Sequence, residues 1–148
     1  MGTMESEQEK KVVLQDNERY KIEVDITNSI LYVKCRKHLE ADALHAKYLS
    51  ILDIINTYKL KYLLTDVRSI HHLNLKDASW LISNVIPAMK DSTLLKYARL
   101  EDAGSMLHLN SMHLKCKLDT ETPEARVLQF ETFVDEESAL HWLLNEEE

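Results

Sequence analysis

Glycine is almost absent from this sequence of 148 residues, which contains only two. Glycine provides the backbone freedom that tight phosphate-binding loops need. The motifs GxGxxG and GxxxxGK[ST], which cradle nucleotide phosphates, therefore cannot occur in this chain. Its scarcity excludes the standard dinucleotide-binding and P-loop classes.

Cysteine is equally scarce, since Cys35 and Cys116 are the only two. No CxxC pair occurs, and this excludes the common zinc motifs built on cysteine. Two cysteines can form one disulfide, but free thiols are the expectation for a cytoplasmic protein. Cys35 alternates with Leu31 and Val33, so we expect its thiol to face the core and to be inert.

Long apolar runs and an excess of basic residues are also missing. No apolar run approaches the length of a transmembrane helix, and the N-terminal residues contain no apolar signal core. The formal net charge is −7, whereas nucleic acids and anionic membranes attract basic surfaces. We therefore expect a cytoplasmic domain without a cofactor, a nucleic-acid partner or membrane insertion.

The first third of the chain predicts a leader and a β-hairpin. Residues 1–18 are polar without a sustained period, which is typical of a mobile leader. Residues 20–26 alternate between apolar and polar, as a strand with one wet face does. Residues 30–36 form a second apolar strand, and Asn28 between the two tolerates the backbone conformation of a tight turn.

Beyond the hairpin, strand-like and helix-like periods alternate. Helices are expected over 40–58, 76–90, 103–116 and 135–144, and strands over 61–67, 93–101 and 126–133. We place a single domain at 19–145, with a loop at 118–125 and an acidic tail at 146–148. The order β-β-α-β-α-β-α-β-α predicts the α/β class, with one mixed, mostly parallel five-stranded sheet covered by helices.

This order of elements resembles the STAS domain of anti-sigma-factor antagonists, in the group of small SpoIIAA-like stand-alone domains. Three segments carry the resemblance, namely YKIEVDITNSILYVKC, KYLLTDVRSI and FETFVDEESALHWLL. They span nearly all of residues 20–144. The resemblance implies a STAS/SpoIIAA-like fold and a non-enzymatic regulatory or scaffolding module. Such a module would bind a protein partner or a small apolar or anionic ligand.

One feature of the antagonist branch is missing. Its members carry a phosphorylatable serine after the third strand, in a stretch that resembles Asp-Ser-Ser-Gly. Aligning the strand-end aspartate on Asp66 places residues 74–77 at that stretch, and none of them is a serine. Ser79 comes too late to replace it. The resemblance therefore implies a member of the family without the phosphorylation switch.

Polar residues gather where the third expected strand ends. Asp66, Arg68, His71 and His72 lie there, and ligands of open α/β sheets favour the carboxyl ends of strands. Arg68 can bind a carboxylate or a phosphate through two parallel hydrogen bonds, and Asp66 can orient it. The favoured alternative is a structural role, with Asp66 capping loop amides or paired to Arg68 and both histidines in solvent. Trp80, just off its apolar helix stripe, either lines a pocket or packs at the core edge.

Seven histidines raise the question of a metal site. His71 and His72 are adjacent, so they point apart in an extended segment, and His108 and His113 miss the i, i+4 spacing of helical ligand pairs. No HExxH motif occurs, and we expect no metal site.

The alternative to a binding module is a small enzyme that uses the four strand-end residues as acid–base and anchoring groups. A homodimer through a sheet edge or a helix face is compatible with the sequence.

Overall fold

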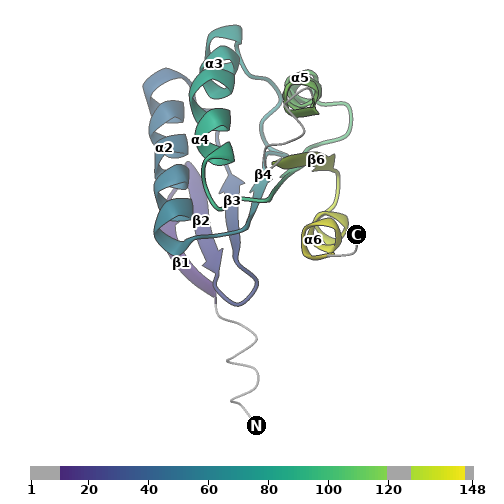
Figure 1. Cartoon of the computed structure of the whole chain (residues 1–148). Coiled ribbons are helices and arrows are strands. Elements are labelled where there is room, and N and C mark those ends of the chain that lie inside the picture. Colours follow the sequence, from purple (N-terminus) through teal and green to yellow (C-terminus); the bar gives the residue numbers. More distant parts are fainter. Residues whose placement is uncertain (1–10, 120–127, 146–148) are drawn as a thin grey trace.

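The structure is a computed structural model that describes residues 11–119 and 128–145. A six-stranded sheet runs through the molecule, with helices packed on both of its faces (Figure 1). The strands are β1 (Lys11–Asp16), β2 (Tyr20–Asp25), β3 (Ile30–Cys35), β4 (Tyr62–Asp66), β5 (Lys96–Leu100) and β6 (Gln129–Phe133). The helices are α2 (Ala41–Tyr58), α3 (Leu75–Trp80), the π-helical turn η1 (Leu81–Val85), α4 (Ile86–Lys90), α5 (Leu107–Asp119) and α6 (Glu136–Leu144).

The strands lie in the sheet in the order in which they occur in the chain. β1, β2 and β3 form an antiparallel meander, whereas β3, β4, β5 and β6 are parallel neighbours. Parallel neighbours need a crossover connection, and a helix follows each of the strands from β3 to β5. The expected α/β class and the mixed, mostly parallel sheet are confirmed.

The predicted number of strands is wrong, because the sheet has six and not five. The additional strand, β1, lies in the segment that was expected to be a mobile leader, and it pairs with β2. A register shift between Val13 and Gln15 interrupts this pairing. Such a bulge breaks the alternation of side chains by which a strand is recognised in a sequence. The other predictions for 1–10, 120–125 and 146–148 lie outside the described residues.

The helix expected over 76–90 is one continuous helical segment made of α3, η1 and α4. Pro87 lies at the start of α4 and does not end the helix. In a regular α-helix its ring would clash with the carbonyl group of the residue four positions earlier, which is Ser83. The wider turn η1 contains Ser83, and such turns change the local backbone spacing.

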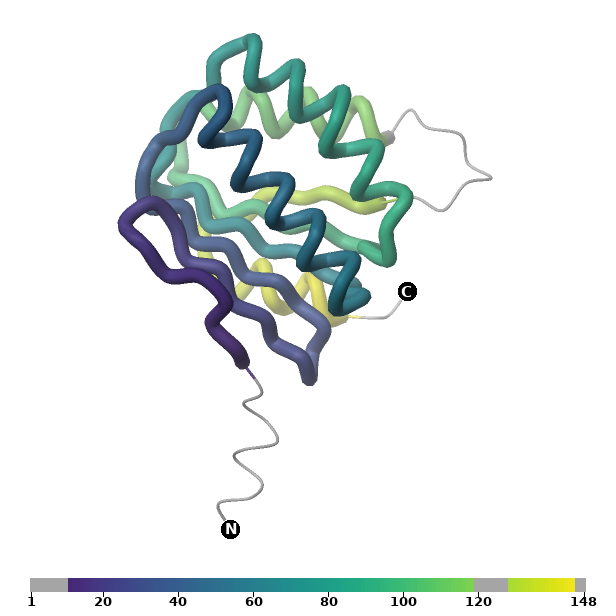
Figure 2. The backbone as a smooth tube through the Cα atoms, turned by 90° about the vertical axis from the view of Figure 1, so that its left-hand side faces the viewer, coloured from purple at the N-terminus to yellow at the C-terminus, as the bar shows by residue number. Residues whose placement is uncertain are grey.

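The alternation of side chains divides the sheet into two faces. The main core lies between one face and the helices α2, α3–η1–α4 and α5, and it contains Ile22, Leu31, Leu63, Tyr97 and Phe130 of the strands. On the opposite face a smaller core joins Leu64, Ala98 and Leu100 to α6. Figure 2 shows α2 and α3–α4 on one side of the sheet and α6 on the other.

No described helix has the length and apolar character needed to cross a bilayer. The C-terminal helix α6 is capped by Asp135, whose side chain accepts a hydrogen bond from the Ser138 backbone N–H. A side-chain acceptor at this position satisfies one of the free N–H groups of the first turn.

Candidate functional site

Asp66 and Arg68, the first two candidates from the sequence, bind each other. Arg68 donates from Nε to Asp66 Oδ1 at 2.9 Å and from a terminal nitrogen to Asp66 Oδ2 at 2.7 Å. The Arg68 backbone N–H donates to the same carboxylate. Burial would raise the pKa of Asp66, but these hydrogen bonds outweigh it, so the pKa is lowered from its ordinary value. The carboxylate is therefore charged at neutral pH, and both of its oxygens already accept hydrogen bonds from Arg68.

This pair borders a groove of about 180 Å³ on the face of the sheet that carries α6. The charged residues around the groove are Lys11, Lys21, Lys34, Arg68, Glu23, Asp66 and Glu136. Tyr32 also lines it, and burial together with the nearby Asp25, Glu136 and Glu23 raises the pKa of Tyr32 to about 12. Cations and carboxylates nearly balance here, so the groove offers little net charge to fix an anion.

The structure does not bring the two histidines to this groove. The His71 backbone carbonyl accepts a hydrogen bond from Ser105 at 3.4 Å, and its side chain is exposed. The His72 ring stacks on the ring of His38, with centroids 4.4 Å apart. His38 borders a cavity on the main-core side of the sheet, not the groove of Asp66 and Arg68. The four strand-end candidates thus divide between two places.

Trp80 marks a third place. Its ring stacks on the ring of His45, with centroids 3.8 Å apart and the planes within 9° of parallel. Both rings line an open depression of about 380 Å³ at the N-terminal ends of α2 and α3. Nearby, the buried Asp77 carboxylate accepts from the Ala41 backbone N–H and so joins the two helix starts. Trp80 therefore lies apart from Asp66 and Arg68.

A small, partly open cavity of about 30 Å³ lies among the loops after β3 and β4 and beside β5, on the main-core side of the sheet. Its apolar walls are Leu39, Leu44, Val67, Ile70, Leu73, Leu81 and Leu107. Its polar lining consists of Lys37, His38, Lys47, Tyr48 and Arg99. A space of this size holds a few small atoms, about the size of one or two water molecules.

Lys47 is one of two buried cations at this cavity. Only 5% of the residue is exposed, and its ammonium group donates to Cys35 Sγ at 3.2 Å. The nitrogen also lies 4.9 Å from the centroid of the Tyr48 ring. Burial raises the pKa of that phenol well above 10, so Tyr48 is neutral. Among residues 11–119 and 128–145, no carboxylate lies within ion-pair distance of Lys47.

Arg99 is the second buried cation, with 2% of the residue exposed. One terminal nitrogen donates to Asn110 Oδ1 and Ser111 Oγ, both at 2.9 Å, and the other donates to the Tyr97 hydroxyl at 3.2 Å. These partners are neutral. The nearest acidic group in this network is Glu101, which accepts from Ser111 and lies 3.0 Å from His108.

Two residues that line the cavity, Arg99 and His38, each have a polar atom without a hydrogen-bond partner in the described part of the chain. Burial lowers the pKa of Arg99, but Tyr97, Tyr48 and Glu101 outweigh it, and the net shift is upward. Arg99 Nε and His38 Nδ1 are buried without a hydrogen-bond partner in the described part of the chain. Buried polar groups usually have a partner, so each such exception calls for an explanation.

Weaker signals for Lys47 and Arg99 are present in the sequence. Lys47 lies between Leu44 and Ile51 on the apolar stripe of its helix, and all three are buried. Arg99 lies two residues after Tyr97 in β5, so both side chains are on the strand face that packs into the main core. Neither signal is as specific as the polar cluster at 66–72, because a single charged residue on an apolar face does not by itself indicate a site.

Comparisons of the chain with protein-family models, with curated proteins and with solved structures give no significant match.

Proposed function

We propose that this chain is a non-enzymatic binding module whose interior cavity accepts the anionic group of a small ligand with an apolar body. The observation that carries the proposal is the pair of buried cations, Lys47 and Arg99, which border one cavity without a carboxylate in contact with either. A buried charge without an opposite charge costs folding free energy. An anion in the cavity would offset that cost.

The chemistry of the cavity defines the ligand class. The Arg99 Nε–H group is a free donor, and the Lys47 ammonium group has donors to spare beyond its contact with Cys35. Charge-assisted hydrogen bonds of this kind favour a carboxylate, and they strengthen where water is excluded. The apolar walls favour hydrocarbon next to the carboxylate. A small apolar carboxylic acid combines both features.

A STAS/SpoIIAA-like identity is part of the same proposal. It is supported by the sequence segments that resemble that family and by the alternation of parallel strands and helices from β3 to α6. The strand β1 is an addition to the order of elements expected from the resemblance. Because residues 74–77 contain no serine, the regulatory signal in this proposal is a bound ligand rather than a phosphate.

The enzyme alternative has less support. It needs Asp66 and Arg68 to act together with His71 or His72 on one substrate. Asp66 and Arg68 bind each other in the groove on the α6 face, while His72 stacks on His38 beside the interior cavity. A substrate in the groove would therefore lack a histidine base, and one at the cavity would lack the carboxylate.

The test is a titration of the purified chain with acetate, butyrate and octanoate, followed by isothermal titration calorimetry. We expect acetate and butyrate to bind, with no further gain for octanoate, because a space of one or two water molecules leaves no room to bury a longer chain. Lys47→Met removes the charge at similar length, and we expect it to weaken binding at least about tenfold.

Lys34→Met is the matched control, since Lys34 belongs to β3 but lies at the groove on the opposite face. We expect its affinity to equal that of the wild-type protein. Native mass spectrometry of gently purified protein would show whether a small acid co-purifies. Absence of binding of all three acids together with no co-purified species would disprove the proposal, as would equal binding by Lys47→Met.

A further inference from the structure

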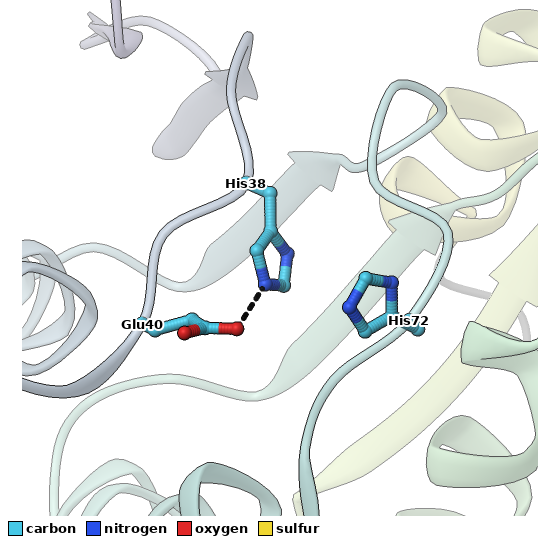
Figure 3. Close-up of side chains that lie close together, drawn as sticks. All are labelled: His38, Glu40 and His72. Atoms are coloured by element: carbon cyan, nitrogen blue, oxygen red, sulfur yellow. Dashed lines mark hydrogen bonds and ion pairs between the residues drawn. The ribbon is translucent and has the colours of Figure 1, made fainter.

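Two loops bring His38, Glu40 and His72 together at the carboxyl ends of β3 and β4 (Figure 3). His38 Nε2 lies 2.9 Å from Glu40 Oε2. The rings of His38 and His72 stack with their planes 28° apart. One ligating atom from each residue lies within 4.8 Å of the other two. Two donors from the loop after β3 and one from the loop after β4 thus meet at one point of the surface.

The fold fixes these donors through their apolar neighbours. Leu39, between His38 and Glu40, and Leu73, directly after His72, both pack against the main core. Glu40 has an extended backbone and is the residue from which α2 starts, so a long helix anchors it. Successive side chains of an extended segment point to opposite sides. With the leucines turned inward, the three polar side chains are presented on the outer side.

The set of donor atoms identifies the class of ligand. Two imidazole nitrogens and one carboxylate oxygen suit Zn²⁺ and related first-row divalent ions, and catalytic zinc sites use this set with an open position. Calcium and magnesium prefer oxygen ligands alone. We propose that His38, Glu40 and His72 form a binding site for a divalent transition-metal ion, with its remaining coordination positions open to solvent.

The geometry needs only side-chain rotation to close on an ion. Bonds of about 2.0–2.2 Å place tetrahedral donor atoms about 3.4 Å from one another. The His38–Glu40 pair is already at 2.9 Å, and the donor of His72 has to approach by no more than about 1.5 Å. Glu40 and His72 are exposed, and 55% of the Glu40 side chain is accessible, so their rotamers can change.

The two nitrogens of His38 have different surroundings. Nδ1 is buried, whereas Nε2 faces Glu40. Coordination therefore uses Nε2, and Glu40 changes from its hydrogen-bond partner to a fellow ligand. The two proposed sites share the His38 ring but use different groups, because the ion would bind its outward nitrogen together with Glu40 and His72, which do not line the cavity.

The experiment is a Zn²⁺ titration of the tag-free full chain by calorimetry, in a buffer that does not chelate metals. Co²⁺ serves as the second probe, because its visible absorption reports the coordination of a bound ion. We expect one Zn²⁺ per chain, and we expect His72→Ala and Glu40→Gln each to weaken binding at least about tenfold. The circular dichroism spectra of both variants should match that of the wild-type protein.

His71→Ala is the matched control, because His71 is the exposed neighbour of His72 and takes no part in the cluster. We expect it to bind Zn²⁺ within about twofold of the wild-type protein. Equal binding by His72→Ala and the wild-type protein would overturn the site, as would an equal loss in His71→Ala. No Zn²⁺ binding at all would overturn it too, and would leave the proposed acid binding unaffected.

Discussion

Arg68 and Arg99 lie towards the same end of the sheet, on opposite faces, but they differ in burial and in their hydrogen-bond partners. The Arg68 side chain is 40% exposed and forms two side-chain hydrogen bonds to Asp66. Arg99 is buried, and its hydrogen bonds go to hydroxyl groups and an amide. A paired arginine in solvent has its charge satisfied within the protein. Arg99 has neutral direct partners, with Glu101 one hydrogen bond further away, and its Nε–H group has no partner, so a ligand can use it.

The same contrast separates the two hollows. The groove beside Arg68 contains both signs of charge, whereas the cavity beside Arg99 is smaller, has mostly apolar walls and is bordered by cations. Electrostatic interactions weaken in water and strengthen where water is excluded. An anion therefore gains more from the cavity than from the groove, although the groove is larger.

Arg99→Met should produce the largest loss of stability. It leaves Glu101 buried with one cation fewer, and it removes the donors that satisfy Asn110, Ser111 and Tyr97. Breaking a buried charged network typically costs about 3–5 kcal/mol of unfolding free energy. Urea denaturation followed by circular dichroism measures this loss. A variant that does not fold at all is the extreme form of the expected result.

Arg68→Met is the comparison for that experiment. Its partner Asp66 stays partly exposed, so water replaces the lost hydrogen bonds. We expect a loss below about 1 kcal/mol, as for other surface ion pairs. Equal losses in the two variants would show that burial does not distinguish these arginines, and the contrast would then be invalid.

Lys47→Met should change stability in the opposite direction. A methionine side chain fits the apolar helix face between Leu44 and Ile51 without placing an ammonium group in the interior. We expect the ligand-free variant to be more stable by at least about 1 kcal/mol, because replacing buried charges with apolar groups is often stabilising. The readout is the urea midpoint, with Lys34→Met expected within about 0.5 kcal/mol of the wild-type protein. A strongly destabilised Lys47→Met would mean that the charge serves the fold and not a ligand.

Much of the fold could be predicted because its patterns are local. The alternation over Tyr20–Asp25 and the apolar stripe of α2 depend on neighbours within a few residues of each other. Strand β1 could not be predicted in this way, because the bulge at Val13 and Gln15 breaks its period. It joins the sheet by pairing with β2, and such pairing between two segments cannot be recognised from the pattern of one segment alone.

The candidate sites follow the same rule. Asp66 and Arg68 are close in sequence, so their pairing was one of the alternatives that the sequence offered. His38 and His72 come from loops after different strands, and only the parallel pairing of β3 with β4 places those loops side by side. Lys47 and Arg99 belong to different elements as well. Sites built across a sheet become visible only when the strand order is known.

Asp66→Asn should have the smallest effect, and the effect should depend on pH. The folded state lowers the pKa of Asp66, so its stabilisation is complete above the pKa of the unfolded chain and disappears as the pH falls through the folded value. At pH 7 we expect the variant to lose about 0.2–1 kcal/mol, and the loss should decrease as the pH falls below 3.8.

Urea denaturation of both proteins at pH 7 and at acidic pH measures that difference, and 1 M salt should reduce it at pH 7 because the pair is partly exposed. The loss caused by Arg99→Met should change little under the same salt, since its network is buried. If salt reduced both losses alike, water and ions would reach Arg99, and the cavity would be as open as the groove. The charge of Arg99 would then be screened by solvent, and it would give an anion no more than Arg68 does.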